Sequence, residues 1–290
     1  MSLAVLIPIA LQVSIFATVF AMGLSVSAKE VTWGLRHPGS LGRAVLAMFV
    51  VMPLVAAAMA SLFALKPAVK IALVALSLSP IPPLLPKKEL KASGEASRAV
   101  GLLVAASLLA IVITPVGLSL LAGWFGVDVE VPTGRILRLV AMTILLPLIA
   151  GLILHRLARG LATRLAGPIG KFASVLLIIA VIPILFTTAP AMWSLIGGGT
   201  LAALVAFLLI GLAVGHFLGG ERAEDRTVLA LSTASRHPGI AIAVAGAIAA
   251  SATARPEVQL FAPAILLYLL LGAIVSAVYL AMRRKAASRS

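Results

Sequence analysis

Long apolar stretches follow one another along almost the whole chain, each bounded by charged residues or by proline and glycine. As helices, these stretches are long enough to cross a hydrocarbon core of about 30 Å. The pattern predicts nine spans, at about residues 3–28, 41–64, 68–92, 96–123, 132–157, 166–189, 193–218, 226–251 and 258–282. We therefore expect an all-α polytopic membrane protein in which residues 1–290 form a single transmembrane domain.

Proline interrupts two of the predicted spans. In the third span, the segment 79–86 (SPIPPLLP) lacks so many backbone donors that a continuous helix is excluded. In the eighth span, the segment 236–239 (RHPG) lies about 15 Å from the inner end of the span, near the bilayer midplane. Non-helical backbone at this depth must be satisfied by protein or by a water-filled cavity. Two interrupted helices are typical of the binding site of a secondary transporter.

The composition agrees with a membrane protein, because 62% of the residues are apolar and only 11% are charged. The lipid bilayer is therefore one expected partner. The chain has no cysteine and only 4 histidines, so we expect no metal centre and no other cofactor.

The net charge of +14 follows from the predicted topology. Most loop lysines and arginines fall on the same side as the C-terminal Arg283, Arg284 and Lys285, which predicts a cytoplasmic C-terminus. Nine spans then place the N-terminus outside. Because the basic residues mark loops, a nucleic-acid partner is not expected, and the predicted location is a bacterial inner membrane.

Several short motifs occur in the order and spacing of a known transporter family. They are Met22-Gly23-Leu24-Ser25, Arg36-His37-Pro38, Val51-Met52-Pro53, Ser79-Pro80 with Ala92-Ser93-Gly94-Glu95, Leu145-Leu146-Pro147 with Leu154-His155-Arg156, and the stretch 234–241. Together they resemble the bile acid:sodium symporter family from about residue 25 to 280. The resemblance implies a fold of inverted repeats, here without the family's first helix, in which the two broken helices cross.

The resemblance also implies a division of the helices into two groups. A panel would contain 3–28, 132–157 and 166–189, and a core would contain 41–123 and 193–282. The segment 36–39 (RHPG) would be a loop at the membrane edge, whereas the identical segment 236–239 would lie at the crossing. We therefore expect the repeated letters to be a coincidence.

The family binds sodium through oxygen ligands, and this chain departs from the family at those places. The corresponding residues are Met48, Leu85, Pro86, Ala99, Leu103, Ser232 and Arg236. Of these side chains only that of Ser232 offers an oxygen, and arginine does not ligate cations. We therefore expect a divergent member of the family without sodium sites.

The candidate site is the crossing and its flanks. It contains Ser79, Pro80, Pro82, Pro86, Lys87, Lys88, Glu89, Ser232, Thr233, Ser235, Arg236, His237, Pro238 and Gly239. We hypothesise that Arg236 or a lysine takes the place of sodium as a tethered cation that bridges the two interruptions, with Glu89 as its partner. Alternatively, residues 87–89 lie beyond the hydrocarbon edge and are solvated. The net positive charge and the N-termini of half-helices favour an anionic ligand.

The sequence thus predicts a sodium-independent secondary carrier of a small organic anion that works by alternating access. The resemblance leaves bile acids, pantoate, pyruvate and other organic anions open as substrates. Protons are a candidate coupling ion, carried by His237 or Glu89. An enzyme built on Ser235 and His237 is not expected, because the glycine-serine elbow is absent. The alternative is a transport-inactive, sensory or structural protein on the same fold.

Overall fold

The computed structural model describes residues 3–83, 96–126, 128–251 and 260–287, and all regular structure within them is helical. The elements are α1 (Leu3–Ser25), α2 (Ala28–Val31), α3 (Trp33–Arg36), α4 (Pro38–Val45), η1 (Leu46–Val51), α5 (Met52–Leu62), α6 (Pro67–Leu78), α8 (Ala96–Trp124), α9 (Thr133–Val140), η2 (Ala141–Leu145), α10 (Leu146–Leu157), α11 (Arg159–Leu195), α12 (Thr200–Leu218), α13 (Ala223–Ala234), α14 (Pro238–Ser251) and α15 (Phe261–Ala287). The two elements labelled η are π-helical and continue the helices on either side of them.

The prediction of an all-α polytopic membrane protein is confirmed. Within the described residues, 8 helical segments are long and apolar enough to cross a membrane. The apolar helix α6 is shorter and accounts for the first half of the predicted third span. The second half of that span lies mostly in residues 84–95, outside the described residues.

The predicted boundary between the sixth and seventh spans is wrong. Helix α11 continues to Leu195, through what was expected to be the start of the next span, and α12 begins only at Thr200. The turn is made by the glycines 197–199, all of which have positive φ, a conformation that glycine adopts without steric cost. Helix α11 contains the three prolines Pro168, Pro183 and Pro190, and none of them ends the helix.

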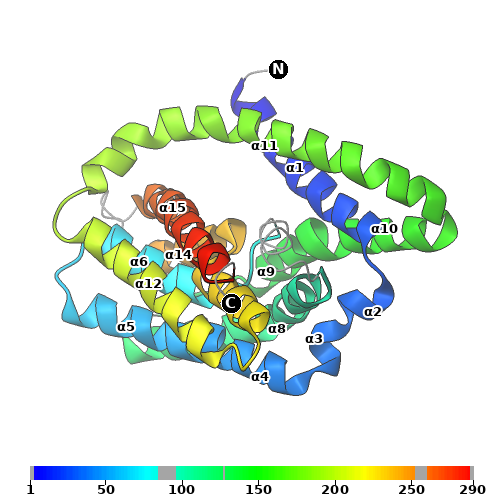
Figure 1. Cartoon of the computed structure of the whole chain (residues 1–290). Helices are drawn as coiled ribbons and strands as arrows, with labels where there is room; N and C mark the ends of the chain where they lie inside the picture. The colour runs from blue at the N-terminus through cyan, green and yellow to red at the C-terminus, as the bar shows by residue number, and fades with distance from the viewer. Residues whose placement is uncertain (1–2, 84–95, 127, 252–259, 288–290) are drawn as a thin grey trace.

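Helices α1, α10 and α11 pack against one another, and α11 arches over the other two (Figure 1). Small residues bring α1 and α10 together, because a Cβ atom on Gly23 would lie only 2.6 Å from the Leu148 carbonyl oxygen. The Ser14 hydroxyl donates to the Ala173 carbonyl of α11 over 2.7 Å. These three helices correspond to the group expected as a panel.

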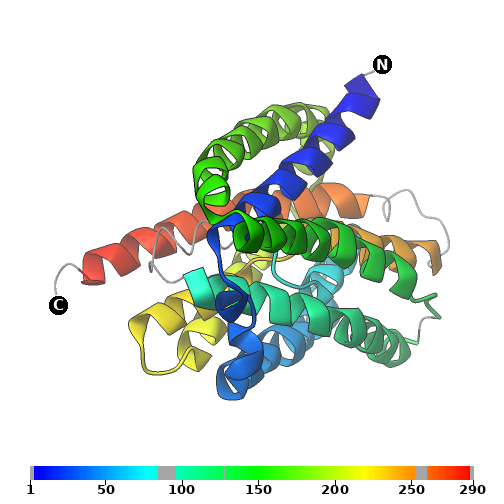
Figure 2. The same ribbon diagram turned by 90° about the vertical axis from the view of Figure 1, so that its right-hand side faces the viewer.

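The remaining helices form a larger bundle around α6, α13 and α14. Helix α6 packs beside α14, and α13 packs beside α12. Element α9 contacts this bundle through α8 and α14, whereas η2 also contacts α1. The continuous segment from α9 to α10 therefore runs between the two groups of helices. The start of α1 and the end of α15 lie at opposite ends of the molecule (Figure 2).

Candidate functional site

The two interrupted segments touch each other at their breaks. Helix α6 ends at Leu78 and is followed by non-helical backbone, and residues 235–237 separate α13 from α14. The backbone N–H of His237 donates to the Pro80 carbonyl over 2.8 Å, and the Arg236 guanidinium donates to the Ser79 carbonyl over 3.2 Å. The crossing therefore consists of backbone and one arginine.

The two half-helices that lead into the crossing are built alike. Both α6 and α13 have 12 residues, and each is followed by a serine with extended backbone. A hydroxyl from a neighbouring helix caps the last carbonyl of each, with Thr114 donating to Leu78 over 2.7 Å and Tyr268 donating to Ala234. Helix ends inside a membrane need such donors, because their last carbonyls have no partner within the helix.

The side chain of Arg236 is completely buried at this point. Its Nη1 atom lies 3.2 Å from the Ser79 carbonyl oxygen and 3.4 Å from that of Met48 in η1. The Tyr268 hydroxyl interacts with the same guanidinium. The C-terminal ends of α6 and α13 also point here, and helix C-termini carry partial negative charge. The guanidinium thus occupies a place where backbone oxygens favour a cation.

The carbonyl of Met48 is available to Arg236 because of the π-helical turn. The Met52 N–H would reach Met48 in an α-helix, but here it bonds to the Ala47 carbonyl. The next residue, Pro53, has no N–H with which to continue the π-helical pattern. The Met48 oxygen therefore lacks a donor from its own helix, and π-helical turns of this kind are frequent at functional sites.

One edge of the guanidinium has no hydrogen-bond partner within the described part of the chain. Among the described residues, none accepts a hydrogen bond from Nε or Nη2 of Arg236, although both atoms are buried. This edge presents two parallel N–H groups, the geometry that binds a carboxylate or sulfonate through two hydrogen bonds. Unpaired buried donors are costly, so the edge favours an oxyanion. Residues 86–89 lie outside the described residues, and the pairing of Arg236 with Glu89 stays a prediction.

His237 caps the start of α14 and contacts the segment from α9 to α10. Its Nδ1 accepts from the Ile240 N–H over 3.3 Å, and its Nε2 lies 3.4 Å from the Thr143 hydroxyl oxygen. That hydroxyl donates to the Leu139 carbonyl, so it accepts from His237. These contacts assign a neutral ring with the proton on Nε2. A second proton on Nδ1 would break the bond to Ile240.

The other site residues expected from the sequence flank the crossing. The Ser79 and Thr233 hydroxyls donate to carbonyls of their own helices. Within the described residues these hydroxyls do not converge on Arg236. The remaining residues are buried or half-buried beside them: Pro80, Pro82, Ser232, Ser235, Pro238 and Gly239.

The places that correspond to the family's sodium ligands form no oxygen cage among the described residues. The Met48, Ala99 and Leu103 side chains are apolar and buried, and Ser232 is the one position there with a hydroxyl. The described residues also contain no group of three or more histidine, aspartate or glutamate side chains that could hold a metal ion.

Sequence reasoning missed three contributors to the site: the Met48 carbonyl, Thr143 and Tyr268. The first two lie in the π-helical turns η1 and η2, and each turn is followed by a proline, Pro53 or Pro147. These prolines were a usable signal, because proline removes a donor from the preceding turn. No comparable signal marked Tyr268, which reaches the crossing from α15.

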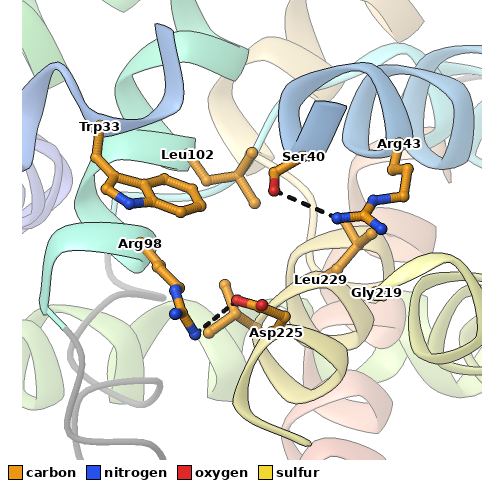
Figure 3. A pocket seen from close by; sticks show the side chains of 9 residues that line it. Trp33, Ser40, Arg43, Arg98, Leu102, Gly219, Asp225 and Leu229 are labelled. Atoms are coloured by element: carbon orange, nitrogen blue, oxygen red, sulfur yellow. Dashed lines mark hydrogen bonds and ion pairs between the residues drawn. The ribbon is translucent and has the colours of Figure 1, made fainter. Parts of the chain in front are cut away.

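A second charged cluster joins α3, α4, α8 and α13 at the end of the molecule where α13 begins. Figure 3 shows Arg98 facing Asp225, with Nη1 and Oδ1 separated by 2.7 Å, and the ring of Trp33 on the other side of Arg98. The guanidinium carbon lies 5.8 Å from that ring. The cavity between them measures about 30 Å³, about enough for one water molecule. The charged cluster therefore links helices, and its cavity is too small to hold an organic substrate.

Residues 12–196 match the family model described as the sodium bile acid symporter family. The match begins within α1 and ends just beyond α11, so it includes η1, α6 and η2. No curated protein matches the chain.

The cap formed by His237 predicts different outcomes for two substitutions. We expect His237→Ala to destabilise the protein by about 1 kcal/mol, because the Ile240 N–H loses its acceptor. The change His237→Asn should cost clearly less, since asparagine is a good N-cap residue and can accept the same bond. Unfolding of the purified variants in one detergent measures both effects. Equal losses for the two variants would show that the ring acts by something other than capping.

Proposed function

Because the chain belongs to the sodium bile acid symporter family, we propose that it is a secondary carrier that moves a small organic anion across the membrane by alternating access. The observation that carries the proposal is the buried Arg236 guanidinium with its Nε and Nη2 edge unpartnered among the described residues. This edge fits a carboxylate or sulfonate. The ligand would thus bind where the two interrupted helices meet.

Alternating access requires part of the molecule to move, because Arg236 is inaccessible in the present conformation. We infer that a panel of 3–28, 132–157 and 166–189 moves relative to a core of 41–123 and 193–282. The packing of α1 against α10 and α11 supports this division. The contact between Thr143 and His237 would then connect panel and core and would change during transport.

Family members are transporters, and the geometry of the site favours transport over hydrolysis. In the described residues, both ring nitrogens of His237 face partners other than Ser235, namely Ile240 and Thr143. A serine nucleophile would need this ring as its base. Because the family's sodium-ligand residues are replaced in this chain, a transport-inactive sensory or structural protein is the second candidate function. An uptake assay distinguishes it from a carrier.

Arg236→Lys tests the role of the unpartnered edge. Lysine keeps a positive charge near the Ser79 and Met48 carbonyls but has no pair of parallel N–H groups. We expect anion affinity to fall at least about tenfold, because charged hydrogen bonds contribute about 1.5–3 kcal/mol. Taurocholate, pantoate and pyruvate are suitable first probes, with binding measured as thermal stabilisation and transport as uptake into proteoliposomes.

Two outcomes would redirect this proposal. Unchanged anion affinity in Arg236→Lys would show that the arginine is purely structural. If Glu89 holds the edge, Arg236→Gln should lose about 3–5 kcal/mol of stability, and adding Glu89→Gln should restore part of it. Additive effects of the two changes on stability would rule out that pairing.

Sodium independence is the second prediction of this proposal. The Arg236 guanidinium donates to the carbonyls of Ser79 and Met48, which leaves these oxygens less available to an inorganic cation. We therefore expect the melting temperature and the uptake rate to be the same in sodium chloride and in potassium chloride of equal ionic strength. A saturable rise in melting temperature with sodium alone would contradict the prediction.

The proposed orientation has the N-terminus outside and the C-terminus in the cytoplasm of a bacterial cell. Basic residues gather where α15 ends, α13 begins and α3 meets α4. They include Arg36, Arg43, Arg222, Arg226, Arg283 and Arg284. An excess of lysine and arginine marks the cytoplasmic side. A C-terminal green fluorescent protein should therefore fluoresce, and alkaline phosphatase fused there should be inactive; active phosphatase would reverse the orientation.

A further inference from the structure

A cavity of about 320 Å³ lies beside α6, on the part of this half-helix that is remote from the crossing. Its volume is at the lower end of the range for small-molecule sites, about 300–1,000 Å³. Helices α5, α6, α8 and α14 and the connection after α8 line it through Ala60, Lys70, Ile71, Val74, Leu118, Leu121, Ala122, Phe125, Val129 and Ile248. Lys70 is the single charged residue in this lining.

The Lys70 ammonium has no partner among the described residues. It makes no hydrogen bond or ion pair there, unlike Lys66 one turn earlier, which donates to the Ser194 carbonyl. The exposed Asp128 and Glu130 flank Val129 but do not line the cavity. Lys70 lies in the first turns of α6 and is half-buried in a lining that is otherwise apolar. A positive charge in such surroundings is costly unless an anion joins it.

The cavity and Arg236 lie near opposite ends of α6, because Arg236 contacts Ser79 just after this helix. Lys70 precedes Ser79 by nine residues on α6, which corresponds to about 13 Å along the helix axis. Helix α14 likewise starts at the crossing and contributes Ile248 to the cavity. Two cationic positions therefore follow one another along α6 and α14, first Lys70 and then Arg236.

We propose that this cavity is a second anion site, an entry site that holds an organic monoanion with an apolar body before it reaches Arg236. Lys70 provides a compact single charge for a carboxylate, and the surrounding side chains accept only apolar surface. The proposal rests on the proposed transport of organic anions and specifies its substrate class as amphipathic monoanions. A doubly charged anion would leave one charge uncompensated in the apolar lining.

Because the chain has no cysteine, a single engineered thiol can report on the cavity. The variant Ala122→Cys places it in the lining, and the neighbouring Gly123→Cys provides a matched control, since a Cβ atom at Gly123 meets nothing within 4 Å. The probe is 4-phenylbutyrate, and the uncharged 4-phenylbutanol is its isostere. The readout is the rate of modification by N-ethylmaleimide in a non-ionic detergent.

We expect 4-phenylbutyrate to slow the modification of Ala122→Cys at least about fivefold, while 4-phenylbutanol at the same concentration has little effect. The added change Lys70→Met should abolish this protection, because methionine fills similar space without charge. Modification of Gly123→Cys should not respond. Equal protection by acid and alcohol, protection that survives Lys70→Met, or no protection by the acid would each overturn the proposal. Equal protection would identify a general apolar pocket, such as one for lipid chains.

A second measurement does not depend on the engineered thiol. In an Arg236→Lys background, 4-phenylbutyrate should still raise the melting temperature, and adding Lys70→Met should remove this rise. A rise that persists would contradict the assignment to Lys70. Uptake by the parent separates the two proposals. Protection of Ala122→Cys without any uptake would support an anion site at Lys70 but disprove transport and with it the role in entry. Uptake without protection would disprove the site at Lys70 alone.

Discussion

The arrangement depends on how a membrane protein satisfies interrupted backbone in its interior. Each unpaired carbonyl in a hydrocarbon environment costs several kcal/mol, so a broken helix is stable only if neighbours supply donors. The Arg236 guanidinium supplies two such bonds, to Ser79 and Met48, and Thr114 and Tyr268 cap the half-helices. Conversely, these carbonyls partly compensate a buried positive charge. The arginine and the crossing therefore stabilise each other.

This mutual stabilisation links structure to the proposed function. In the proposed carrier, the arginine would take the place of an inorganic ion between the half-helices. The carbonyls use only Nη1, while Nε and Nη2 have no acceptor in the described part of the chain. The same residue can thus hold the crossing together and bind an anion. Lys70, near the start of α6, places a second positive charge in the cavity beside this helix.

Periodicity and proline content were sufficient to predict the class of fold and the approximate positions of the 8 described helical segments that are long enough to cross a membrane. They were also sufficient to place the eighth-span break, since Pro238 cannot continue the hydrogen bonding of α13. They could not predict the end of α11, because proline tolerance depends on neighbouring contacts. Nor could they identify the Met48 carbonyl as an acceptor for Arg236 or Tyr268 as the donor to Ala234, because these contacts join residues far apart in the chain.

The two copies of Arg-His-Pro-Gly show which structural features follow from the local sequence and which depend on tertiary contacts. In both copies, proline is the first residue of a helix and histidine precedes it, so the proline has the same local role in each. The sequence alone determined that a helix starts at each of these prolines, because the fixed φ of proline suits the first position of a helix. Only the tertiary structure leaves Arg36 exposed and buries Arg236, since carbonyls from distant segments surround the second copy alone.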